Sequence, residues 1–240
     1  MSRVFQAAYF SARNILIYGT IFASTALAGG EARAQDIDTA SSWNGSEGIC
    51  CWGVPSTETY GQLITPTGTQ TSLSGFTFYM GGSAPVNFQA YVYAWNSGTN
   101  AVTGPALFTS AVMTAPNTGG SFTPVTINAG ATALTPGQQY VLFLTTATAP
   151  NPTNGAYVWG STGNTNPYAG GQFVYSHGTG SDFTIPWSVI TGIDDLAFMA
   201  FFGPPGLSTD GLNGNQTSIA SNVNGIIRAA PLPSRRSRWP

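Results

Sequence analysis

The only two cysteines of the chain are neighbours, Cys50 and Cys51, and Trp52 follows them. In an exported protein cysteines generally pair, yet adjacent Cα atoms lie only about 3.8 Å apart across a trans peptide, which is less than a disulfide normally spans. A bridge between them would act either as a rigid turn that closes the N-terminal segment onto the fold or as a flat apolar plate that meets a ligand. A catalytic thiol is not expected, because it would need a positioned base.

The single histidine, His177, lies near Ser176, Ser181 and Asp182, which are the residue types of a hydrolytic triad. A triad is assembled from separated elements, and this segment has no Gly-x-Ser-x-Gly turn to present a nucleophile. We therefore expect a surface loop here. One histidine without a Cys-x-x-Cys pair also excludes the usual zinc sites.

Residues 86–95 alternate between an apolar row and a row of larger polar and aromatic side chains. In a strand, the alternation places these two rows on opposite faces. The second row would stack sugar rings if it is exposed, with amides at one end for hydrogen bonds. The alternative is that loops or another strand cover it, as aromatic side chains in a sandwich commonly require. The row consists of Asn87, Gln89, Tyr91, Tyr93 and Trp95.

Two adjacent carboxylates, Asp194 and Asp195, begin the last apolar segment. They repel each other unless a cation or hydrogen bonds compensate, or unless both are solvated. Glycoside hydrolysis would need two carboxylates facing each other across a sugar bond. Nothing in the spacing of these two residues, Glu47, Glu58 and Asp182 selects such a pair, so we expect no catalysis.

The framework that holds these side chains is predicted to be all-β. Apolar residues recur with period two, and clusters of Gly, Pro, Asn and Thr interrupt them at short intervals, which is typical of stacked antiparallel sheets. We expect a two-sheet antiparallel sandwich over residues 56–204, with Phe88, Val92, Leu142 and Phe198 buried. The expected strands are Glu58–Thr65, Leu73–Met80, Val86–Trp95, Ala106–Ser110, Phe122–Asn128, Gln139–Thr145, Gly155–Gly160, Gln172–Ser176 and Ile193–Phe202.

The charge distribution restricts the partners. The chain has no lysine, and its arginines lie only within residues 1–34 and 228–240, whereas eight acidic residues lie between these segments. Nucleic-acid binding is excluded for the central part, because phosphates require basic side chains. Disorder is not expected either, because 12% of the residues are aromatic.

Residues 1–34 have the features of a signal peptide. Arg3 and Arg13 precede the uncharged, mostly apolar run Ile15–Gly30, and Ala32-Arg33-Ala34 supplies a small-x-small cleavage site. The run is shorter than the roughly 20 residues of a spanning helix, so cleavage is preferred over a retained anchor. No later segment is apolar for long enough to cross a bilayer as a helix, so we expect no transmembrane segment in the mature chain. Residues 35–55 would form an N-terminal arm ahead of the sandwich.

A jelly-roll domain of exported bacterial proteins resembles this chain in five short segments: Thr57–Gln62, Phe88–Trp95, Gly104–Phe108, Leu134–Tyr140 and Asp195–Phe198. The resemblance covers about residues 57–202, and such domains often precede a sorting signal or a translocator. Sugar-binding jelly rolls are similar in carrying an Asp-Asp pair before an apolar strand, where one Asp holds a structural calcium. The resemblance thus implies calcium bound by Asp195, and oxygen ligands from Glu58 and backbone carbonyls would suit this ion.

Residues 205–227 resemble the connector that precedes the β-barrel of autotransporters. Leu212, Ile219, Val223 and Ile226 fall on one helical face, which predicts a short helix. An eight-stranded barrel needs at least about 80 strand residues, so residues 228–240 do not contain the translocator. Their abrupt arginine content indicates either a disordered basic tail or, as we prefer, the product of a shifted reading frame.

Together these features predict an exported, non-catalytic binding or adhesion module, located in the periplasm, at the outer membrane or in the medium. The expected ligand is a glycan or another surface polymer. Two alternatives remain open, a structural passenger without a ligand and a secreted glycan hydrolase. An exposed aromatic row favours the binding module, a covered row favours the structural passenger, and facing carboxylates in a groove favour the hydrolase.

Overall fold

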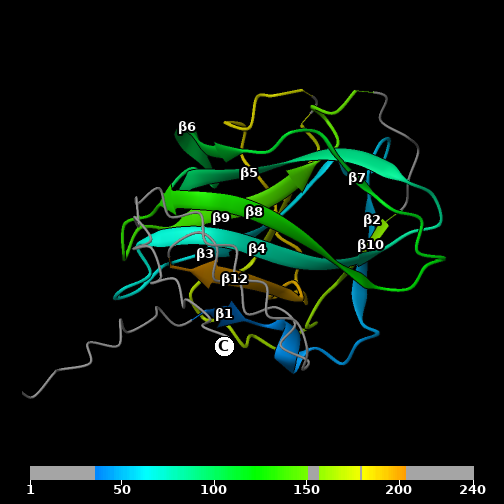
Figure 1. Cartoon of the computed structure of the whole chain (residues 1–240), viewed down its shortest axis with the longest axis horizontal. Helices are drawn as coiled ribbons and strands as arrows, with labels where there is room; N and C mark the ends of the chain where they lie inside the picture. Colours follow the sequence, from blue (N-terminus) through cyan, green and yellow to red (C-terminus); the bar gives the residue numbers. More distant parts are fainter. Residues whose placement is uncertain (1–35, 151–156, 179, 204–240) are drawn as a thin grey trace, which may run out of the picture. The chain divides into compact units, whose positions relative to one another are not determined.

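The computed structural model describes residues 36–150, 157–178 and 180–203, which form two antiparallel sheets (Figure 1). The first sheet has the order β1 (Ile37–Asp38), β12 (Phe198–Phe202), β4 (Ser72–Gly81), β10 (Tyr157–Gly160) and β2 (Gly48–Trp52), with β8 (Thr123–Ala133) also paired to β4. The second has the order β11 (Phe173–Ser176), β3 (Thr59–Ile64), β9 (Tyr140–Thr145), β5 (Val86–Asn96) and β6 (Ala101–Thr109), with β7 (Met113–Ala115) paired to β5. The predicted all-β, two-sheet sandwich is confirmed.

The N-terminal arm is where the strand prediction was incomplete. Residues 36–55 do not precede the sandwich but add β1 and β2 to the two ends of the first sheet, and a single 3-10 turn, η1 (Ala40–Ser42), lies between these strands. Strand β1 has only two residues, and β2 contains two outward residues in succession, so neither shows a clear period of two. The three-residue strand β7 was missed for the same reason of length.

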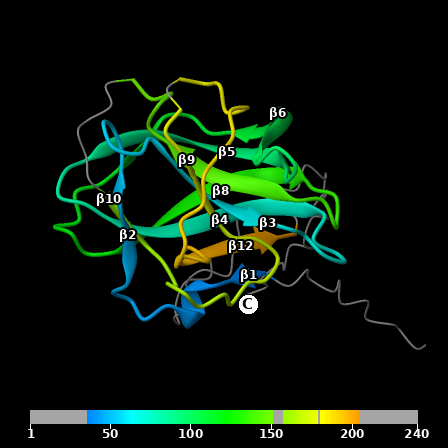
Figure 2. The ribbon, with the colours of Figure 1, turned by 180° about the vertical axis from the view of Figure 1, so that it is seen from behind.

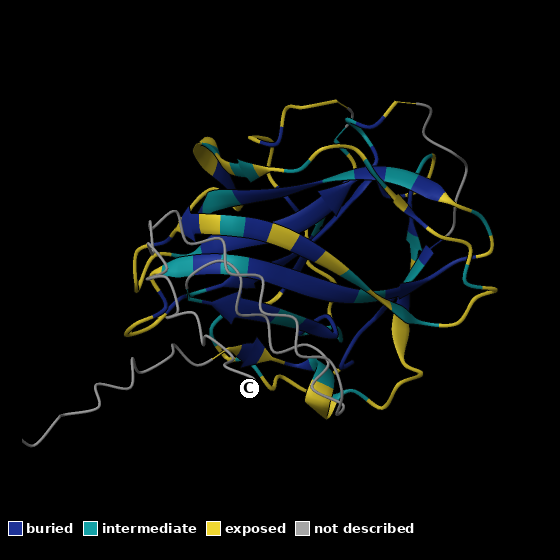
Figure 3. Cartoon of the chain, viewed as in Figure 1, coloured by how far each residue is buried: buried dark blue, intermediate teal, exposed yellow. Residues whose placement is uncertain are grey.

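The main core lies between the two sheets. Phe88, Val92, Leu142 and Phe198, which the sequence predicted to be buried, are fully buried. Strands β3 and β9 are buried along their whole length, so they lie centrally in the second sheet (Figure 3). Because both faces of these strands are buried, a second group of side chains must cover the outer face of the second sheet.

A second apolar cluster covers the outer face of the second sheet. Residues 180–192, called here the covering segment, run across β9 and β5 on the side seen in Figure 2. Their Phe183 and Trp187 are buried against Phe143 of β9, with ring centroids 4.9 and 5.1 Å away. The fold therefore has three layers at this point: first sheet, second sheet and covering segment.

Several predicted elements lie outside the described residues. These are the signal peptide (1–34), the connector with its short helix (205–227) and the basic tail (228–240). Within the described ranges, the structure contains no helix of the length and hydrophobicity needed to span a membrane.

Trp52, the last residue of β2, contacts both sheets. It is fully buried, its ring lies 5.2 Å from that of Trp159 and 5.9 Å from that of Phe88, and its indole N–H donates to the carbonyl oxygen of Leu144 on β9 at 3.3 Å. Removing this side chain would leave a large cavity between the sheets and would remove the hydrogen bond to Leu144.

We predict that Trp52→Ala lowers the free energy of unfolding by about 3–5 kcal/mol, as measured by urea denaturation. The matched control is Trp43→Ala, because Trp43 is only half-buried against Tyr79 and Phe122. The control should lose less than half as much. Equal losses in the two variants would contradict the assigned role of Trp52.

Candidate ligand-binding groove

The predicted aromatic row is not an exposed platform. Tyr91 and Trp95 are only 7% and 4% exposed, because Phe183 and Trp187 of the covering segment lie over them. The ring centroids are 5.2 Å apart for Tyr91 and Phe183 and 5.6 Å for Trp95 and Trp187. Tyr93 is half-buried in the same cluster, where burial raises the pKa of its hydroxyl. The aromatic row is therefore covered by another segment of the chain, as the second alternative from the sequence stated.

The two amides of the same row are engaged within the protein. Asn87 donates from Nδ2 to the carbonyl oxygen of Pro150 and accepts from the hydroxyl of Thr114. Gln89 donates from Nε2 to the carbonyl oxygen of Ser110. These groups hold loops beside β5, and they would have to exchange partners before they could bind a sugar.

The predicted calcium ligands Glu58 and Asp195 do not form one site. Asp195 contacts β3 at Gln62, four residues along the extended chain from Glu58, which corresponds to about 13 Å. Both carboxylate oxygens of Asp195 already accept protein hydrogen bonds. In the described ranges there is also no group of three or more His, Cys, Asp or Glu residues that could hold a metal ion. The residues present do not fit the predicted calcium site, and Glu58 is instead buried with one carboxylate oxygen, Oε2, unpartnered within the described chain.

The residues around His177 are not arranged as a triad. The Nδ1 atom of His177 lies 3.0 Å from the carbonyl oxygen of Ser56. Ser176 is buried and accepts from the backbone N–H of Gly178, while Asp182 accepts from both the N–H and the hydroxyl of Thr184. The hydrogen bonds from Thr184 hold the pKa of Asp182 below its usual value. Among the described residues, no hydrogen bond joins His177, Ser176 and Asp182 to one another.

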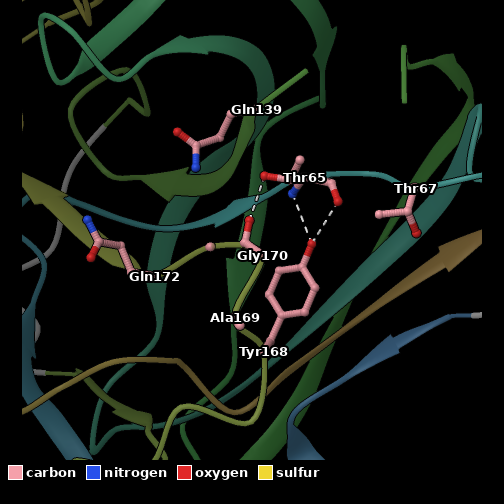
Figure 4. A pocket seen from close by; sticks show the side chains of 8 residues that line it. Thr65, Thr67, Gln139, Tyr168, Ala169, Gly170 and Gln172 are labelled. Atoms are coloured by element: carbon pink, nitrogen blue, oxygen red, sulfur yellow. Dashed lines mark hydrogen bonds between the residues drawn. The ribbon is translucent and has the colours of Figure 1, made fainter. Parts of the chain in front are cut away.

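A groove with a volume of about 630 Å³ opens between the end of β3 and the loop before β11. This is within the size range of small-molecule binding sites. Figure 4 shows the ring of Tyr168 between Thr67 on one side and the side chains of Gln139 and Gln172 on the other. The complete lining is Thr65, Thr67, Gln139, Tyr168, Ala169, Gly170, Gly171 and Gln172.

The wall formed by Tyr168 is fixed to β3 by a set of hydrogen bonds. The Tyr168 hydroxyl accepts from the N–H of Thr65 at 2.9 Å and donates to the carbonyl oxygen of the same residue at 3.1 Å. The Thr65 hydroxyl in turn donates to the carbonyl oxygen of Gly170 at 2.6 Å. The next residue, Gly171, lies so close to β3 that a Cβ atom would overlap the carbonyl oxygen of Leu63, so a glycine is required there.

The buried carboxylate of Asp195 holds the backbone of Tyr168 in place by a hydrogen bond. Its Oδ2 accepts from the backbone N–H of Tyr168 at 3.0 Å, and its Oδ1 accepts from Nε2 of Gln62 at 2.7 Å. The Oε1 atom of Gln62 accepts from the N–H of Leu196 at 2.9 Å, which fixes the orientation of the Gln62 amide. The groove is consequently preorganised by a network that is itself part of the core.

The groove offers neutral hydrogen-bonding groups. The backbone oxygens of Gln139 and Gln172 accept from Trp95 and Leu63, but their side-chain amides have no hydrogen-bond partner among the described residues. The lining contains no Asp, Glu, His, Cys or Lys. Burial raises the pKa of the Tyr168 hydroxyl, so this group stays neutral. The arrangement can bind a polar ligand through its amide and hydroxyl groups.

A smaller cavity of about 280 Å³ continues the groove past Thr65, Thr67 and Tyr168 toward β1. It adds the side chains of Asp36 and Asp38, each of which accepts a backbone N–H through Oδ1, from Phe202 and Ser41 respectively. Sequence reasoning missed both cavities, because their lining comes from three segments far apart in the chain and each segment alone resembles an ordinary turn. The pair Gly170-Gly171 was the only local signal of a close backbone approach.

Comparison with known proteins gives little further information. No family model matches the chain, and no curated protein matches it in sequence. Among solved structures, it is similar to the crystal structure of the cysteine protease and lectin-like domains of Cwp84, a surface layer associated protein of Clostridium difficile, with a TM-score of 0.40 and 11% identity. The match covers 62% of this chain and 32% of that chain. A likeness this distant carries no conclusion about function.

The titration of Asp195 yields a testable dependence of stability on pH. Burial raises the pKa of Asp195 to about 6, against the opposing effect of the hydrogen bonds from Tyr168 and Gln62, and the charge of Asp194 adds to the increase. The folded chain therefore keeps a proton between about pH 4 and pH 6 that the unfolded chain has released. The contribution of this group to stability is greatest below pH 4 and falls as the pH rises to about 6.

We predict that the stability of the unmodified chain relative to Asp195→Asn decreases by up to about 3 kcal/mol between pH 4 and pH 7. Urea denaturation at both pH values measures this difference. Asp194→Asn is the control, because it retains Asp195 and should keep most of the pH dependence. A relative stability that is constant, or that increases with pH, would rule out a raised pKa.

Proposed function

We propose that this chain is an exported, non-catalytic binding module and that the groove beside Tyr168 binds a neutral glycan. The observation that carries the proposal is the groove itself, which is lined by amides, hydroxyls and one aromatic ring, without an ionised side chain. Sugar hydroxyls both donate and accept hydrogen bonds, as do the free amides of Gln139 and Gln172. Export is proposed from the signal-like residues 1–34.

Charge supports a neutral ligand over an anionic one. No lysine or arginine occurs at any described position, whereas Asp36 and Asp38 line the cavity next to the groove. Phosphate, sulfate or uronate groups would be repelled and would find no basic partner. Glycans without such groups, either free or on a surface polymer, are therefore the preferred class.

Binding is favoured over hydrolysis by the same lining. A glycosidase needs two carboxylates on opposite sides of the scissile bond. Asp36 and Asp38 both belong to the short segment at β1 and lie at one end of the groove. The covered aromatic row favours the remaining alternative, a structural passenger without a ligand, and this alternative predicts no binding at all.

We expect the Gln139→Ala and Gln172→Ala variants each to weaken glycan binding about 3- to 10-fold, the effect of losing one or two neutral hydrogen bonds. The measurement is calorimetric titration with neutral hexose and N-acetylhexosamine oligosaccharides, supported by retention on insoluble polysaccharides. Gln138→Ala is the matched control, since Gln138 is exposed, adjacent in sequence and absent from the groove lining.

The two groove variants should unfold at the same temperature as the parent, because their amides have no hydrogen bond among the described residues to lose, whereas Gln138→Ala loses those to Trp95 and Gln139. If all three variants bind as tightly as the parent, the groove is not the site. If no neutral glycan binds the parent, the structural passenger is the better description.

A further inference from the structure

The two cysteines occupy a β-bulge at the edge of the first sheet. Among the described strands, β2 pairs with β10, and Trp52 lies opposite Tyr157 while Ile49 lies opposite Trp159. Cys50 and Cys51 therefore face a single residue, Val158, and the ladder is shifted there. The bulge explains the sequence Ile-Cys-Cys-Trp: the two large apolar residues point inward, and both cysteines between them remain near the surface.

The structure joins Cys50 and Cys51 in a disulfide, and this disulfide is accessible. Cys50 is exposed and Cys51 is half-buried, whereas the flanking Ile49 and Trp52 are buried. A thiolate from solvent can thus approach the sulfur of Cys50 without any opening of the core. Because the chain has no other cysteine, exchange within the molecule can only re-form the same bond.

The disulfide is not needed to hold the fold together. The stabilisation that a cross-link supplies through chain entropy grows with the length of the loop it closes, and this loop is the shortest that two cysteines can form. The same stretch of chain is held independently by Trp52, which donates to Leu144, and by the N–H of Gly53, which donates to the carbonyl oxygen of Thr57 at 2.8 Å. These two contacts do not involve the sulfur atoms of Cys50 and Cys51.

We propose that Cys50–Cys51 is a reversible redox site that dithiols reduce in the folded protein. A thiolate of the dithiol attacks Sγ of Cys50, and Cys51 leaves as a thiolate and takes a proton. The second thiol of the dithiol then attacks its own sulfur in the mixed disulfide and releases Cys50. The protein gains two electrons and two protons, and the dithiol is oxidised to its disulfide.

The adjacency of the cysteines selects dithiols over monothiols. After a monothiol has attacked Cys50, the released Cys51 thiol lies next to the mixed disulfide at a very high effective concentration. It expels the monothiol before a second molecule arrives, so the monothiol adduct does not accumulate. A dithiol escapes this reversal because its own second thiol is equally close.

The test treats the folded full chain with dithiothreitol or with reduced glutathione at equal thiol concentration. Iodoacetamide then alkylates the free thiols, and the intact mass gives the number of alkylated cysteines. We expect alkylation of both cysteines after dithiothreitol and of neither after glutathione. The reduced chain should bind one equivalent of phenylarsine oxide, which requires two neighbouring thiols. Its β-sheet circular dichroism should be unchanged, and its melting temperature should fall by no more than about 5 °C.

Cys51→Ser is the decisive variant, because it keeps the exposed Cys50 but removes the thiol that expels an adduct. Oxidised glutathione should form a stable adduct with this variant and none with the reduced parent, which should instead return to the bridged form. Labelling of the parent only in urea, or loss of the β-sheet signal together with reduction, would overturn the proposal. Accumulation of a glutathione adduct on the parent would overturn the selectivity for dithiols.

Discussion

A single buried carboxylate connects the fold to the groove. Asp195 is completely buried, and no lysine or arginine occurs among the described residues to pair with it. An uncompensated charge in this position would be costly, so hydrogen bonds from Gln62 and Tyr168 must supply the compensation. Since Gln62 lies on β3, while Asp195 leads into β12 through Leu196, the same contacts join the two sheets and place the groove wall. The wall of the groove therefore cannot shift without disturbing the core.

The alternation of side chains was sufficient to predict the sandwich. Long strands such as β4 and β5 bury one face against the other sheet, and this produces a period of two that is visible in the sequence. The burial of Phe88 followed directly from that period, whereas Leu142 lies in a run that is apolar on both faces. Strands at the edges did not follow the rule, because β1 is too short to have a period and the bulge in β2 interrupts its alternation.

The candidate site was much less predictable, and the reasons lie in long-range contacts. The outward row with Tyr91 and Trp95 has the same sequence pattern whether it faces solvent or a loop. The covering segment has no periodic pattern from which its position over this row could be predicted. The separation of Glu58 from Asp195 depends on which residue of β3 meets the last strand, a register that no local pattern encodes. The groove combines residues near positions 65, 139 and 170, so it exists only once the sheets are assembled.

The bulge in β2 also bears on how this protein avoids self-association. An outer strand of a sheet offers unpaired backbone groups to any other extended chain, and many proteins protect such strands with charged side chains. Strand β2 contains no charged side chain, so charge does not protect this edge. Two outward cysteines opposite one residue break the regular spacing that an incoming strand would have to match. At this edge, irregular backbone geometry takes over the protection against aggregation that charge provides elsewhere.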